Sequence, residues 1–158
     1  PNNRYTNDAK IAEAVVSMLA KINIKVDLKT MPKAQYWPKF DERAADIMMI
    51  GWHSDTEDSS NFTEFLTMCP NKETGMGQYN SGNYCNKEVD SLIKASQSET
   101  DPAKRAAMLQ KVEQMLHDDA AFIPLHWQNL PWAAAKGVHI ENIVNVMNFP
   151  YLGDLVID

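Results

Sequence analysis

The chain has 158 residues, of which 44% are hydrophobic and 23% charged. This composition is typical of a globular protein with one compact core, and the length is too short for two full domains. The net charge of −6, without a cluster of Lys or Arg, disfavours sequence-independent binding of nucleic acid, because such binding needs a basic surface. Apolar runs such as Ile47–Ile50 reach only four residues and cannot span a bilayer.

The hydrophobic pattern alternates between helical and strand periodicity, which predicts an α/β protein. Apolar residues at three- and four-residue steps predict a first helix that is capped by Asn7 or Asp8 and continues to about Ile22. Residues 24–28 then alternate apolar and charged side chains, which predicts a strand with one face in water.

The next elements follow two prolines. A second helix is expected after Pro32, and Pro38 should break or kink it because proline removes a helix hydrogen bond. Residues 47–51 form a continuous apolar run, which predicts a strand buried on both faces, as in a parallel sheet covered by helices.

Three further helices and two strands are expected downstream. A short helix should carry Phe62, Phe65 and Leu66, and Asn86 should cap the next one. Asp101-Pro102 is a strong helix start, and the helix behind it should end near residue 120. Residues 121–127 and 132–138 are expected to be strands joined by a turn, and the tail after them irregular or made of short strands.

A parallel βαβ unit needs a strand ahead of its helix, and residues 1–6 are too short and too polar to supply one. We therefore expect the chain to be a fragment whose preceding strand lies upstream.

Cys69 and Cys85 lie sixteen residues apart, on either side of a loop-like stretch. Without a Cys-x-x-Cys motif or a suitably spaced His they make a poor zinc site. We expect a disulfide, which indicates an oxidising compartment, and the alternative is two unpaired thiols in a cytosolic protein.

The stretch from Gly51 to Asp58 carries the most chemical information. It follows a predicted buried strand, and ligands in open α/β sheets bind outside the carboxyl ends of strands. Trp52 beside Asp55 suits an organic cation, since the ring offers cation–π contact and the carboxylate offers charge-assisted hydrogen bonds. The alternative is a packing Trp and an Asp that caps the helix starting near Ser59. Calcium is disfavoured because the acidic residues do not have the spacing of a calcium loop.

Catalytic and metal motifs are not apparent. The four His are scattered without ligand spacing, no Ser lies in a Gly-x-Ser-x-Gly elbow, and no Gly-rich phosphate loop occurs. We expect no metal, no cofactor and no enzymatic activity. The competing hypothesis is a stand-alone α/β hydrolytic enzyme that uses the acidic loop 55–58.

Several motifs are spread along nearly the whole chain. They are Asn3-Arg4-Tyr5-x-Asn7-Asp8 with Ile11-Ala12-Glu13-Ala14, Leu19-x-x-Ile22-x-Ile24-x-Val26, Gly51-Trp52-x-x-Asp55-x-x-Asp58-x-x-Asn61-Phe62, the Cys69 to Cys85 loop running into Val89-Asp90-x-Leu92-Ile93, and Lys104-Arg105 followed later by Ile123-Pro124-Leu125. Together and in this order, they resemble the second lobe of family 5 extracellular solute-binding proteins.

The resemblance implies one lobe of a type II periplasmic-binding-protein fold, with a mixed sheet flanked by helices. Residues 1–158 would be a single C-terminal lobe, with the N-terminal lobe in another part of the protein. The implied function is the substrate-binding component of an ABC uptake transporter, which binds short peptides or related small solutes between two lobes. It would deliver them to an ABC permease, which for a protein in the periplasm would be its only link to a membrane. The location would be the periplasm, or the outer face of a Gram-positive membrane to which the protein is anchored.

The resemblance also implies roles for single residues. In peptide binders of this family the Asp of the Gly-Trp-x-x-Asp motif pairs with the ligand α-ammonium, and that position matches Asp55. Trp52 matches the neighbouring Trp, and His53 lies between the two. Some dipeptide binders hold the ligand carboxylate with an Arg ahead of the first helix; simple alignment places Asn2 there, with Arg4 two residues on.

Overall fold

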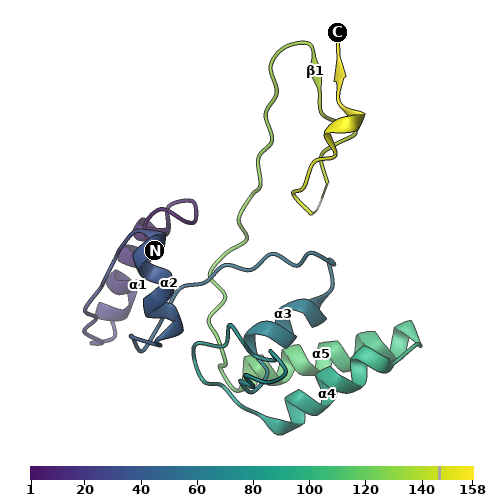
Figure 1. Ribbon diagram of the computed structural model, residues 1–158. Helices are drawn as coiled ribbons and strands as arrows, with labels where there is room; N and C mark the ends of the chain where they lie inside the picture. The colour runs from purple at the N-terminus through teal and green to yellow at the C-terminus, as the bar shows by residue number, and fades with distance from the viewer. Residues whose placement is uncertain (146) are drawn as a thin grey trace.

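The computed structural model describes residues 1–145 and 147–158. Its elements, in chain order, are α1 Asp8–Ala20, α2 Lys33–Asp41, α3 Ser59–Leu66, α4 Lys87–Ser98, α5 Pro102–Asp118, β1 Val138–His139, the 3₁₀ turn η1 Leu152–Asp154 and β2 Val156–Ile157. In Figure 1, α1 and α2 form one group and α3, α4 and α5 another, while residues after α5 run out as an extended segment to β1. The five predicted helices are therefore confirmed.

Side-chain caps explain where three of the helices begin. Asn86 accepts a hydrogen bond from the backbone N–H of Glu88, and Asp101 accepts from those of Ala103 and Lys104. These caps satisfy N–H groups that have no partner inside the helix, as the sequence predicted. Asp58 caps α3 in the same way through Ser60 N–H.

The first helix starts differently. Asn7 occupies the cap position of α1 with φ at 58° and makes no side-chain cap bond. The buried Asp8 carboxylate instead accepts from the backbone N–H groups of Arg4, Tyr5 and Ala9. Burial alone would raise the pKa of Asp8, but these three donors outweigh it and lower the pKa.

The main apolar core lies between α4 and α5, beside the end of α3. Its fully buried members are Met68, Val89, Ile93, Val112 and Leu116. The buried positions of α5 recur at three- and four-residue steps, as expected for a helix that packs one face against the core. This core places the start of α5 beside the start of α3, where the candidate site lies.

A second, smaller apolar cluster involves α2. Tyr36 and Phe40 are buried, and the Tyr36 hydroxyl donates to Met49 O at 2.7 Å, which ties α2 to the segment that leads into the site. Burial raises the pKa of Tyr36 to about 12. Pro38 does not end α2, which continues to Asp41. A single proline removes only one N–H donor, and this short helix tolerates that loss.

The strand predictions for residues 24–28, 47–51, 121–127 and 132–138 are wrong for the structure as described, apart from the overlap of the last with β1 at Val138. The sheet found among the described residues is the antiparallel pair β1–β2, in which Val138 faces Ile157. The predicted buried run begins with Ile47, whose surface is 70% exposed. A strand needs a second strand to bond its N–H and C=O groups, and these segments have no such partner within the described residues. The short strand in the tail agrees with prediction.

Among the described residues, no helix combines the length and the apolar character that crossing a membrane would require.

Candidate ligand-binding site

Residues 52–58 form a tight loop that connects segment 47–51 to α3. Ser54 closes the loop: its Oγ donates to Asp58 O at 3.0 Å and accepts from Asp58 N–H at 3.2 Å. Glu57 completes the turn with a left-handed φ of 55°, and its N–H donates to Ser54 O at 3.3 Å. Asp55 lies within this closed loop, and its side chain is 74% exposed.

Asp55 has a solvent-facing carboxylate beside one basic side chain. His53 Nδ1 lies 3.6 Å from Asp55 Oδ1, which is too long for a strong hydrogen bond. The alternative interpretation, in which an Asp of this loop caps the following helix, is met by Asp58 and not by Asp55. Asp55 is therefore not used as the cap of α3, and its exposed oxygens can accept hydrogen bonds from a cationic ligand.

Trp52 has a structural role at the start of the loop. Its Nε1 donates to Asn61 Oδ1 at 2.8 Å, and its ring packs against Phe65 at 5.6 Å and Tyr79 at 5.4 Å between centroids. These contacts match the packing alternative for Trp52. They also fix the direction in which the chain enters the loop, because Trp52 is held by α3 and by the segment between Cys69 and Cys85.

The segment that carries Arg4 reaches the same end of segment 47–51. The Tyr5 ring covers Gly51, where a Cβ atom would lie only 2.7 Å from Tyr5 Cε1, so a larger residue would displace the ring. The Tyr5 hydroxyl also approaches Gly51 O at 3.5 Å. Arg4 itself lies over the Tyr5 ring, 5.0 Å from its centroid. The predicted ligand residue Arg4 and the predicted ligand residues of the loop thus come from segments that are in contact through Tyr5 and Gly51.

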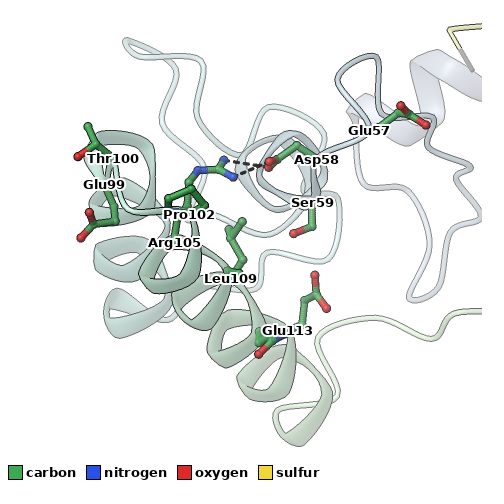
Figure 2. Close-up of a pocket in the computed structure, with 11 residues that line it drawn as sticks. Glu57, Asp58, Ser59, Glu99, Thr100, Pro102, Arg105, Leu109 and Glu113 are labelled. Carbon is green, nitrogen blue, oxygen red and sulfur yellow. Dashed lines mark hydrogen bonds and ion pairs between the residues drawn. The ribbon is translucent and has the colours of Figure 1, made fainter.

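An ion pair that sequence reasoning missed holds the end of the loop. Arg105 grips Asp58 with both ends of its guanidinium, with Nη1–Oδ2 at 2.5 Å and Nη2–Oδ1 at 3.0 Å (Figure 2). The Arg105 hydrogen bond is the largest influence on the pKa of Asp58 and, against partial burial, holds it well below its usual range. Both residues stand in the motifs noted in the sequence, but no local pattern shows that residues so far apart in the chain pair.

An open groove of about 490 Å³ lies beside this ion pair, between the loop and α5. Its lining residues are Glu57, Asp58, Ser59, Glu99, Thr100, Pro102, Arg105, Ala106, Leu109, Gln110 and Glu113, most of which Figure 2 labels. Acidic side chains outnumber the single Arg in this lining. None of the predicted ligand residues belongs to it, so the groove and the predicted ammonium site are different places.

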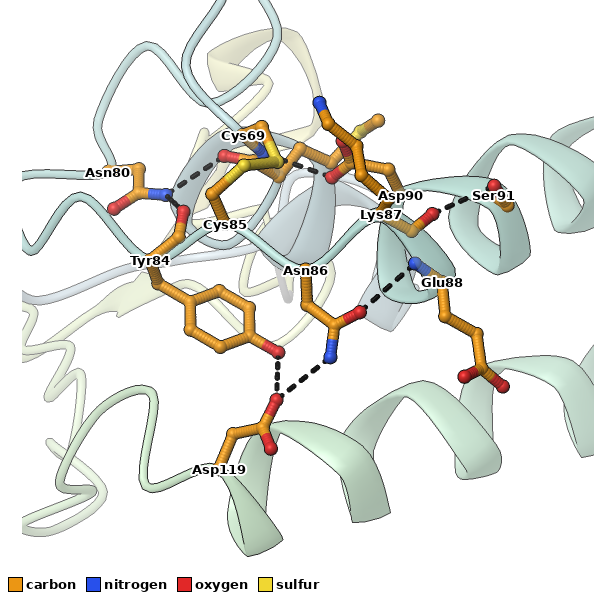
Figure 3. The surroundings of a disulfide bond; sticks show 11 residues. Cys69, Asn80, Tyr84, Cys85, Asn86, Lys87, Glu88, Asp90, Ser91 and Asp119 are labelled. Carbon is orange, nitrogen blue, oxygen red and sulfur yellow. Dashed lines mark hydrogen bonds and ion pairs between the residues drawn. A yellow bond between two sulfur atoms is a disulfide. The ribbon is translucent and has the colours of Figure 1, made fainter.

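The predicted disulfide between Cys69 and Cys85 is present (Figure 3). Side chains around it hold the loop it closes: Asn80 Nδ2 donates to Met68 O and to Tyr84 O, at 2.9 and 2.8 Å. The buried Asp90 of α4 accepts from Cys69 N–H at 3.0 Å. The bridge therefore joins the end of α3 to the start of α4, on the side of the core where Trp52 packs.

Tyr84 and Asn86 fasten the far end of the disulfide loop to α5. The Tyr84 hydroxyl donates to Asp119 Oδ2 at 2.6 Å, and Asn86 Nδ2 donates to the same oxygen at 3.0 Å (Figure 3). Burial, with the Asp119 hydrogen bond, raises the pKa of Tyr84 to about 12.

Metal chemistry finds no support in the part of the chain that the structure describes. No group of three or more His, Cys, Asp or Glu side chains there could hold a metal ion.

The sequence is similar to a family of known proteins. Residues 1–74 match the model of the bacterial extracellular solute-binding proteins, family 5 middle. Relatives include the oligopeptide-binding protein OppA of Bacillus subtilis, 31% identical over 88% of this chain and 24% of its own length. Di/tripeptide-binding protein 4 of Pseudomonas aeruginosa is 26% identical over 78% of this chain and 23% of its own length. Heme-binding protein A of Haemophilus influenzae is 27% identical over 75% of this chain and 21% of its own length.

The chain thus spans about a quarter of the length of the curated relatives it matches. The matched residues 1–74 include the helix start at Asp8, the loop that holds Asp55 and one end of the disulfide. The chain belongs to the family 5 bacterial extracellular solute-binding proteins.

Proposed function

We propose that this chain is one lobe of the substrate-binding component of an ABC uptake transporter, and that it binds short peptides. The observation that carries the proposal is that the two Asp residues of the loop 52–58 have different surroundings. Asp58 is committed to Arg105 and to the start of α3, while Asp55, three residues earlier, presents an exposed carboxylate. In this proposal Asp55 pairs with the ligand α-ammonium, with Trp52 and His53 beside it.

The lobe assignment accounts for the exposed apolar segments. Trp127 is fully exposed, and the extended segments around Ile47 and Ile123 also leave large apolar side chains in solvent. We propose that residues 1–158 form a C-terminal lobe whose mixed sheet is completed by strands from the rest of the protein. Closure of a second lobe over Asp55 would exclude water and strengthen its pairing with an ammonium.

Peptides are favoured over the other ligand classes that the relatives' names suggest. The relatives include di/tripeptide-, oligopeptide- and heme-binding proteins. The loop holds two acidic side chains at its exposed surface, Asp55 and Glu57, against one His. A negatively charged loop attracts the ammonium of a peptide and repels carboxylates. The ligand carboxylate therefore needs a basic partner elsewhere, and Arg4 is the candidate.

The hydrolytic alternative would use the carboxylates of the same loop. Asp58 is poorly suited to it, because its ion pair with Arg105 keeps it ionised and engaged. A general acid or base needs a pKa near the working pH. Binding without chemistry is also what membership of the family supports. We propose that the protein hands its ligand to an ABC permease, from the periplasm or from the outer face of a Gram-positive membrane.

The test is Asp55→Asn in the intact protein, which keeps the side-chain shape and removes its charge. Loss of one partner of a desolvated charge pair costs about 2–5 kcal/mol, or roughly 30- to 4,000-fold in affinity. Calorimetry with short peptides should show this loss, and an N-acetylated peptide should bind the unaltered protein about as weakly. Glu57→Gln, a matched control in the same loop, should have a far smaller effect. Unchanged affinity in Asp55→Asn would refute the ammonium role.

A further inference from the structure

Arg105 lies where three helices meet. From the start of α5 its Nε donates to Ser96 O near the end of α4 at 3.1 Å, and its Nη2 donates to Ser60 Oγ at the start of α3 at 3.2 Å. The same guanidinium holds both oxygens of Asp58. Its side chain is 29% exposed and that of Asp58 is 31% exposed, so the pair is largely shielded from water. A planar guanidinium with this many partners has a fixed orientation.

The contact between Arg105 and Asp58 also restrains Asp55, through the backbone of the loop. Asp58 bonds Ser54 Oγ with both its N–H and its C=O, and Ser54 directly precedes Asp55 in the chain. The base of the loop is thus closed by Ser54 and Asp58 and anchored to α5 by Arg105. The two bonds between Ser54 and Asp58 and the two between Asp58 and Arg105 form one connected network. Residues in such a network lose their interactions together.

The ion pair also gives Asp58 and Asp55 different availability for a ligand. Arg105 keeps Asp58 occupied, so that the carboxylate nearest to α3 does not compete with Asp55 for a cation. A ligand ammonium that paired with Asp58 would first have to displace a two-pronged arginine contact, which is among the strongest charge-assisted hydrogen-bond arrangements.

We propose that Arg105 is a positioning residue of the ligand site: through Asp58 and Ser54 it holds Asp55 in place for the ligand ammonium without touching the ligand. This inference rests on the proposed function for the role of Asp55. It adds a residue on α5, outside the loop, that sets the affinity and selectivity of the loop.

The first experiment examines the loop without ligand. Amide hydrogen exchange of the intact protein is compared between Arg105→Gln and Lys104→Gln, which removes the same charge from an adjacent, exposed position. Exchange of residues 54–60 should become roughly tenfold faster in Arg105→Gln only, within the range for residues that share one network. Should Arg105→Gln fail to fold, Asp58→Asn carries the same test, because its amide oxygen can still cap α3. Equal exchange in the variant and the control would overturn the proposal.

The second experiment asks whether the loop matters for the ammonium. Arg105→Gln should weaken binding of a free-amine peptide roughly tenfold and leave the weak binding of its N-acetylated form unchanged. In an Asp55→Asn background it should have no further effect, since Arg105 acts only through Asp55. Arg105→Lys, which keeps the charge but not the fork, should recover part of the affinity. A merely structural role would instead lower both affinities alike, in both backgrounds, and would overturn the proposal.

The two experiments separate the failures. Faster loop exchange together with unchanged peptide affinity in Asp55→Asn would refute the proposed function, and with it the ligand role of Arg105. A steep loss in Asp55→Asn with no loss in Arg105→Gln would refute the positioning role alone.

Discussion

Removal of the Cys69–Cys85 disulfide tests how this part of the fold is stabilised. The bridge closes a loop with a sequence separation of 16, and the chain-entropy model gives about 3 kcal/mol for a loop of that length. In the folded state the loop is also held by Asn80 and by Asp90, which accepts from Cys69 N–H. We therefore expect the double Ser variant to keep its fold and to lose about 3 kcal/mol of unfolding free energy, mostly through a less restricted unfolded chain.

Asn80→Ala separates the two contributions. Asn80 is buried, and its loss leaves Met68 O and Tyr84 O without their shared donor, which should cost about 1–3 kcal/mol. Because the disulfide acts on the unfolded chain and Asn80 on the folded loop, the two losses should add within about 0.5 kcal/mol.

Equilibrium urea unfolding, followed by tryptophan fluorescence, measures all four proteins of this cycle. Reductant should destabilise the disulfide-bonded forms and leave the double Ser variant unaffected, which is the control. A double Ser variant within 1 kcal/mol of the parent would refute the entropic reasoning. A much larger Asn80→Ala loss without the disulfide would show that the bridge instead shapes the folded loop.

Two further predictions concern backbone and pH. Gly77 has a φ of 63°, and a Cβ there would lie 2.2 Å from Met68 O, so Gly77→Ala should be strongly destabilising by thermal unfolding, whereas Gly82→Ala, with open space around it, should not. The pKa of Tyr84 is raised to about 12, so the folded state keeps its proton longer and its contribution to stability is complete below about pH 10. Stability should therefore fall as pH rises from 10 to 12, and Tyr84→Phe should make that fall shallower; an equally steep fall would contradict the assignment.

Helices were predictable here because their signals are local. Asn86 and Asp101 lie two or three residues before the N–H groups that they cap, and proline follows Asp101 at the first helical position. The buried stripe of α5 recurs within a few turns of one helix. Each of these features depends on residues within a short window, so the local sequence predicts the helix without information about the rest of the protein.

Strands were not predictable in the same way. The alternation at 24–28 and the apolar run at 47–51 show which side chains avoid water, but a ladder needs partner N–H and C=O groups from elsewhere. Ile47 and Trp127 remain exposed among the described residues, so the pattern marks apolar side chains that the described fold leaves in solvent. Periodicity alone does not specify that partner, and the mixed sheet stays a proposal.

The candidate site shows where sequence reasoning stops most sharply. Asp55 and Asp58 are the same residue type, three positions apart in one acidic loop, and by sequence either could bind a cation or cap the helix. The structure separates their roles through Arg105, which lies 47 positions further along the chain from Asp58. The same guanidinium also bonds Ser96 O, so the packing of α5 against α4 places it beside Asp58, which is paired, while Asp55 is left exposed. The chemistry of the loop is thus determined by helix packing, which acts on it from outside the motif that first drew attention to it.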